Sequence, residues 1–207
     1  MTQETSSVPS KVTGDTLTSS ELNEINGTVN ANAADSESRL VTLESGQSGT
    51  AQGWGYYKDN AASQVIGLTD TKLTIDGLGS TSNLSYLPSG VANLWDTVTN
   101  KVISTGVGDS YTLRLDLPIT DKGNNADYIR FKMDIGSGAT PSIIVVERII
   151  GLPDVSELPT TVSVSFSYFS LSTFDANNAQ FFLSTNSQTV TVTNPAVAIF
   201  RTTGAVL

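Results

Sequence analysis

Residues 111–117 read YTLRLDL, the clearest of several alternating stretches in this chain of 207 residues. Leucine fills every second position, and Arg114 and Asp116 stand between the leucines. Successive side chains of a β-strand point to opposite faces, so the stretch predicts a strand with one buried and one solvated face. The same alternation recurs at residues 129–135, 161–168 and 188–193. These segments predict an antiparallel β domain.

Further strands are predicted on either side of these segments, at residues 65–68, 72–76, 97–103 and 196–202. Residues 142–150 are apolar on both faces, which predicts a central strand that is covered on both sides. Roughly eight strands separated by turn residues, with no convincing helix between them, indicate a sandwich or a barrel. A jelly-roll-like sandwich is the favoured topology. An immunoglobulin-like sandwich stays open, because strand order cannot be read from one sequence.

The aromatic residues divide the chain into parts with different composition. No Trp, Tyr or Phe precedes Trp54, so the first fifty or so residues cannot build an ordinary core. We expect an extended polar tail at 1–16, a helical stalk at 17–45 and a Gly/Ser linker at 46–53. The β domain is expected to occupy residues 54–207.

The stalk prediction depends on a capping box and an apolar stripe. Residues 18–21 read TSSE, in which the side chains of Thr18 and Glu21 can each accept the other's backbone N–H. Apolar or small residues then recur every three or four positions, at Leu22, Ile25, Val29, Ala33, Ser36, Leu40 and Leu43. Two partners for this stripe stay open: the chain's own β domain, or further copies in a short parallel coiled coil. Small and polar layers at its centre would weaken a coiled coil while fixing its register.

Composition excludes most familiar chemistry. The chain has no histidine and no cysteine, which removes histidine-based triads, thiolate nucleophiles, disulfides and Cys/His zinc sites. Twenty acidic against eleven basic residues give a net charge of −9, which disfavours a nucleic-acid partner. No apolar stretch is long enough to span a bilayer, and residues 1–10 lack the pattern of a secretory signal. We therefore expect neither an enzyme nor a resident cofactor. No metal ligands are assigned, and the oxygen-rich residues 121–127 are interpreted first as a turn, with a calcium site as the open alternative.

Two residue groups are candidates for a site. The strand carboxylates Asp116, Asp134 and Glu147 could serve a depolymerase, but they alternate with basic residues, and solvated cross-strand charge pairing explains them more simply. The aromatic residues Trp54, Tyr56 and Tyr57, together with Tyr86 and Trp95, stand in segments that we expect to be irregular. They can stack on sugar rings of a host surface glycan, or they can plug the end of the sandwich.

Residues 14–23 read GDTLTSSELN. This segment is similar to a stretch that opens many virion proteins of tailed bacteriophages. The whole layout, a polar leader, a short helical stalk, a Gly/Ser break and a β domain, resembles phage head fibre and capsid decoration proteins. The resemblance covers about a tenth of the chain by motif and all of it by layout, and tail fibres and baseplate proteins share that layout.

The resemblance implies a homotrimer on the virion surface, assembled in the host cytoplasm. It implies that the leader docks on the major capsid protein or another virion protein, with Val8, Pro9, Val12 and Leu17 as the anchor residues. The alternative is a receptor-binding module of a tail fibre or baseplate that contacts host surface glycan.

Overall fold

The structure is a computed structural model that describes residues 19–20, 23, 26–27, 29–33 and 52–203. The chain divides into two compact units, Met1–Ser48 and Gly49–Leu207. In the first unit every described residue is helical and exposed, including the stalk residues Val29 and Ala33. The other stalk residues and the anchor residues lie outside the described residues: Leu22, Ile25, Ser36, Leu40, Leu43, Val8, Pro9, Val12 and Leu17.

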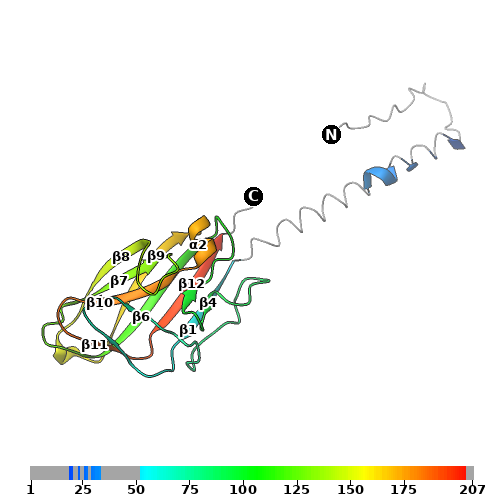
Figure 1. The fold of residues 1–207 in the computed structure, drawn as a ribbon. Helices are drawn as coiled ribbons and strands as arrows, with labels where there is room; N and C mark the ends of the chain where they lie inside the picture. The colour runs from blue at the N-terminus through cyan, green and yellow to red at the C-terminus, as the bar shows by residue number, and fades with distance from the viewer. Residues whose placement is uncertain (1–18, 21–22, 24–25, 28, 34–51, 204–207) are drawn as a thin grey trace. The chain divides into compact units, whose positions relative to one another are not determined.

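The second unit is an antiparallel, jelly-roll-like β-sandwich (Figure 1). Its larger sheet contains β1 (Gly53–Lys58), β2 (Gln64–Ile66), β6 (Ser110–Lys122), β9 (Thr160–Phe169), β11 (Val190–Val192) and β12 (Ala196–Thr203). The second sheet contains β3 (Thr71–Lys72), β7 (Tyr128–Asp134), β8 (Ile144–Gly151) and β10 (Gln180–Thr185). Three short pieces complete the unit: the hairpin β4 (Trp95–Asp96) and β5 (Lys101–Val102), the turn η1 (Val155–Glu157) and the helix α2 (Ser172–Asn177).

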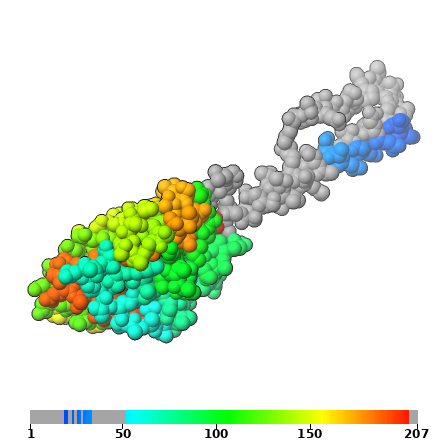
Figure 2. Space-filling view, viewed as in Figure 1, coloured from blue at the N-terminus to red at the C-terminus, as the bar shows by residue number. Residues whose placement is uncertain are grey.

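Strand β6 organises the larger sheet, whose order is β1-β12-β6-β11-β2. One edge of β6 pairs with β9, and the other pairs with β12 in its first half and with β11 in its second half. The two strands between β6 and β9 in sequence, β7 and β8, belong to the opposite sheet, which is the crossing of a Greek key. Strands from the two ends of the unit thus meet, as where β2 pairs with β11 (cyan beside orange-red in Figure 2).

The core lies between the two sheets and confirms the alternation seen in the sequence. Leu113, Leu115 and Leu117 are fully buried on the inner face of β6. Phe131 of the opposite sheet packs 5.4 Å from Phe181 and 5.3 Å from Phe166, measured between ring centroids. All buried hydrophobic residues found in the described part of the chain fall between residues 57 and 199.

Four sequence predictions about the strands are wrong. Of residues 72–76, only Lys72 belongs to a strand, because β3 ends there. Residues 142–150 form an edge strand, because β8 ends its sheet and leaves Ile144 and Ile149 43% and 64% exposed. Residues 97–103 include the turn between β4 and β5, where Asn100 takes a φ of 52° and breaks the strand. Trp54, Tyr56 and Tyr57 belong to the regular strand β1, whereas an irregular segment was expected. Strand β10 was missed because all six of its residues are buried, which removes the alternation.

Candidate functional site

The outer face of the larger sheet is hollowed where β1, β12 and β6 lie side by side. The leucines of β6 point into the core, so Arg114 and Asp116, which stand between them, point to the outer face of the sheet. On β12, Ala198 stands opposite Tyr56 on one side and Arg114 on the other. A methyl group between two long side chains leaves a hollow of about 440 Å³, whose wall consists of Trp54, Tyr56, Thr81, Asn83, Arg114, Asp116, Ala198 and Phe200.

Three aromatic rings pack together beside this hollow: Tyr86 stacks on Trp54, and Phe200 packs against Trp54 at a tilt. The Trp54 ring lies 5.0 Å from the Tyr86 ring at 16°, and 6.0 Å from the Phe200 ring at 32°. Phe200 is the partner of Trp54 on β12, whereas Tyr86 lies at the other edge of β1, where its carbonyl accepts the Trp54 N–H at 2.8 Å. Trp54 is therefore flanked on both sides, and the more exposed rings are Tyr86 (58%) and Phe200 (38%).

A second hollow of about 530 Å³ lies past the contact between Trp54 and Phe200. It shares these two residues with the first hollow and adds Gln52, Gly53, Tyr86, Arg201 and Thr202. We call the two hollows together the outer-sheet groove.

The polar groups of the outer-sheet groove are partly satisfied within the protein. The Oδ1 atom of Asp116 accepts the Arg114 Nε–H at 2.9 Å and the Ser163 hydroxyl at 2.6 Å. The side-chain oxygen of Asn83 accepts the Ser85 N–H at 3.0 Å, which leaves its NH₂ group as a donor. Burial raises the pKa of the Tyr56 hydroxyl, and the Asp116 charge raises it further, so Tyr56 stays a neutral donor.

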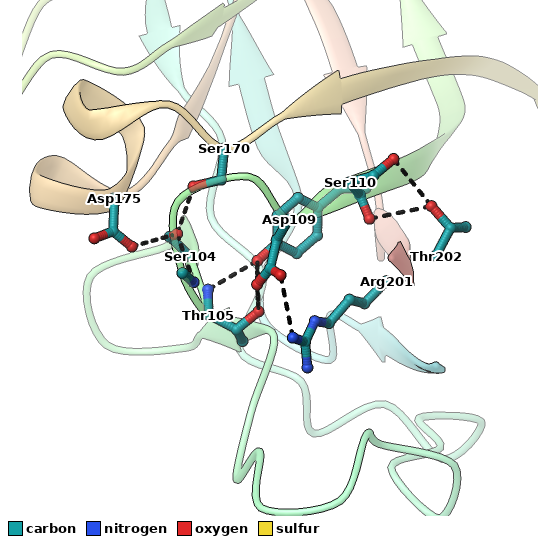
Figure 3. A network of polar contacts seen from close by, with 10 residues as sticks. Ser104, Thr105, Asp109, Ser110, Ser170, Asp175, Arg201 and Thr202 are labelled. Atoms are coloured by element: carbon teal, nitrogen blue, oxygen red, sulfur yellow. Dashed lines mark hydrogen bonds and ion pairs between the residues drawn. The ribbon is translucent and has the colours of Figure 1, made fainter. Parts of the chain in front are cut away.

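Arg201, which lines the second hollow, belongs to a network of polar contacts (Figure 3). The Nη2 atom of Arg201 lies 3.1 Å from Oδ1 of Asp109, and both residues are buried. The other carboxylate oxygen of Asp109 accepts hydrogen bonds from the hydroxyls of Thr105 and Tyr111. Burial raises the pKa of Tyr111, which keeps its hydroxyl protonated as a donor. The network therefore sets the position of Arg201 in the wall.

The structure brings together only part of the predicted glycan surface. Trp54 and Tyr56 line the groove, but Tyr57 points to the opposite face and is 1% exposed, so its inclusion was wrong. Its hydroxyl accepts the Leu94 N–H at 2.8 Å inside the sandwich. Apart from Tyr86 and Asp116, sequence reasoning missed the remaining wall residues, because most of them come from segments far from Trp54 in the chain. The only signal was strand parity, which places Arg114, Ala198 and Phe200 on outer faces.

The three strand carboxylates are divided between the two sheets. Asp116 pairs with Arg114, and Glu147 lies 3.4 Å from Arg130. Burial pushes the pKa of Asp134 upward, but hydrogen bonds from Gln180 and from backbone N–H groups outweigh it and hold the pKa below its ordinary value. Each carboxylate thus has its own partner. No group of three or more metal-ligating Asp or Glu side chains occurs among the described residues.

No helix in the described part of the chain is both long and apolar enough to cross a bilayer. No protein-family model matches the sequence, and no curated protein does.

Three solved structures are similar to this chain over 75% of its length. The Eiger TNF of S. frugiperda is 7% identical with a TM-score of 0.44, over 94% of that chain. The vertex protein P5 of PRD1 is 11% identical with a TM-score of 0.42, over 74% of that chain. The CPMV top component is 14% identical with a TM-score of 0.26, over 82% of that chain.

Proposed function

We propose that this chain is a virion structural protein, a head fibre or capsid decoration subunit that displays its β domain outward. The observation that carries the proposal is the division of the chain into two units, with a sandwich whose core is built from residues 57–199. Because the β domain has a core of its own, the sequence before it is available for a different role. The GDTLTSSELN segment at 14–23 supports attachment to a capsid as that task.

The proposal includes a homotrimer, which the edge of the smaller sheet supports. Ile144 and Ile149 are large apolar residues on β8, a strand that ends its sheet. Exposed apolar residues on an edge strand are an aggregation hazard unless a partner covers them. Further copies of the chain are the partner that a stalk helix would bring close. Light scattering on the full chain should give three times the mass of one chain, and Ile149→Lys should lower that mass. A wild-type monomer would contradict the trimer.

The attachment is tested by deleting residues 1–16 and assembling virions with the shortened protein. We expect the β domain to keep its circular dichroism spectrum and melting temperature, while the protein disappears from purified virions. The full-length variant Val98→Ser, changed at a side chain 88% exposed in the β domain, should be incorporated normally. Incorporation of the shortened protein at the wild-type level would refute the anchor.

A further inference from the structure

We infer that the outer-sheet groove is a binding site for an uncharged saccharide chain of at least two sugar units. The inference does not depend on where the protein sits in a virion, because all the groove residues belong to the second unit. Its basis is the combination of a cluster of aromatic rings, polar side chains that line the wall, and two adjoining hollows.

The aromatic stack suits the apolar face of a sugar ring. Pyranose rings carry C–H groups on one face, and these pack well against aromatic rings. Tyr86 and Phe200 are 58% and 38% exposed, and they pack against Trp54 from different sides, Tyr86 stacked and Phe200 tilted. Trp54 holds the other two rings in place, so the platform exists before a ligand arrives and little conformational entropy is lost on binding.

The polar wall suits hydroxyl groups rather than ions. Arg114 and Asp116 pair with each other and largely cancel their charges at the groove. The pair still offers the terminal amino groups of Arg114 and the Oδ2 atom of Asp116, since the pairing uses Nε and Oδ1. The NH₂ group of Asn83 and the Tyr56 hydroxyl add donors. A sugar with adjacent hydroxyls can use such donors and acceptors at once, whereas an acidic sugar would also meet the chain's net charge of −9.

The shape of the groove indicates more than one sugar unit. Each hollow, at about 440 and 530 Å³, falls within the range of small-molecule sites, roughly 300–1,000 Å³. The hollows adjoin at Trp54 and Phe200 and lie on opposite sides of that contact. A chain that fills both hollows gains two sets of contacts for one loss of translational freedom, so longer saccharides bind more tightly than monosaccharides.

The experiment is a binding titration of the full chain, followed by Trp fluorescence and ligand-observed NMR. The probes are maltohexaose, cellohexaose and chitohexaose, together with an array of neutral and acidic bacterial surface polysaccharides. We expect at least one neutral probe to bind, and to bind about tenfold more tightly than its own monosaccharide, a difference of about 1.4 kcal/mol. Binding to none of the probes, or to acidic polysaccharides alone, would overturn the inference.

Three variants localise the binding. Tyr86→Ala removes an exposed platform ring, and Ala198→Leu fills the floor of the first hollow while leaving its polar wall unchanged. Each should weaken binding of the neutral probe by about tenfold or more. Phe169→Ala removes a ring of similar exposure (63%) that lines neither hollow, and it should leave affinity unchanged. Unaltered affinity in both groove variants would place the saccharide elsewhere. A change in oligomer mass caused by Ala198→Leu would identify the groove as an interface between copies and refute the inference.

Discussion

Arg201 of β12 donates from Nη2 to Oδ1 of Asp109, 3.1 Å away, although 92 residues separate them in the sequence (Figure 3). Their side chains are 9% and 3% exposed, so water screens the pair little. Asp109 comes directly before β6, and Arg201 lies near the end of β12. The ion pair therefore joins the ends of two neighbouring strands at one end of the sandwich.

The first prediction concerns this buried pair. Asp109→Ala breaks the buried ion pair with Arg201 and removes the acceptor of the Thr105 and Tyr111 hydroxyls, so we expect a loss of about 3–5 kcal/mol in the free energy of unfolding. The matched control is Glu147→Gln, which breaks an exposed pair with Arg130 at 3.4 Å and should cost less than about 1 kcal/mol. Urea denaturation measures both. Equal losses in the free energy of unfolding for the two variants would show that burial does not make the Asp109–Arg201 pair more important than an exposed pair.

The second prediction is a pH dependence that originates at Asp59. This side chain is 1% exposed, and its Oδ1 accepts the Asp76 N–H at 2.8 Å. Burial raises the pKa of Asp59, and the nearby charge of Asp76 raises it further. Because the raised pKa belongs to the folded state, ionisation of Asp59 destabilises the fold. The penalty is absent below the ordinary pKa of 3.8, grows as the pH rises from there, and is complete above the raised pKa.

Asp59→Asn should therefore stabilise the protein at pH 7, by about 1 kcal/mol, and make no difference at low pH. Asp96→Asn should have the opposite effect and destabilise the protein at pH 7. Hydrogen bonding from Thr99 lowers the pKa of Asp96, so its contribution is present above the ordinary pKa and is lost as the pH falls. Melting temperatures from pH 3 to pH 8 test the pair. The account fails if Asp59→Asn destabilises the protein at neutral pH.

The third prediction concerns the wall of the outer-sheet groove. A Cβ atom on Gly53 would lie 2.5 Å from the Tyr86 carbonyl oxygen and 2.6 Å from the Pro88 nitrogen, so the backbone would have to move. Gly53→Ala should cost about 1–3 kcal/mol and displace Tyr86 from Trp54. Gly67→Ala is the control, since nothing lies within 4 Å of its added methyl group. Chemical denaturation gives the cost, and Trp fluorescence reports the loss of the stack. Identical stability and fluorescence of the two variants would show that the close packing of Gly53 against the backbone of Tyr86 and Pro88 is not needed for the fold.

Strand identity could be predicted from the sequence where one face is solvated. Leu113, Leu115 and Leu117 alternate with polar residues, and this period places β6 and its faces without any knowledge of its neighbours. Strand β10 shows the limit, because Phe181 and its neighbours are all buried and give no period. Strand β8 shows the same limit, because a run of apolar residues is compatible both with a central strand covered on both faces and with an exposed edge strand.

The sequence by itself determined that the chain carries an antiparallel β domain and which side chains of its alternating strands face outward, because both follow from the two-residue period of a single strand. Only the tertiary structure decided that β8 lies at an edge and that Tyr86 and Phe200 pack against Trp54. These relationships depend on strand order and register between segments far apart in the chain. No local pattern encodes that order. Any two strands with matching apolar faces can pair, and only the packing of the complete core makes one arrangement more stable than the others.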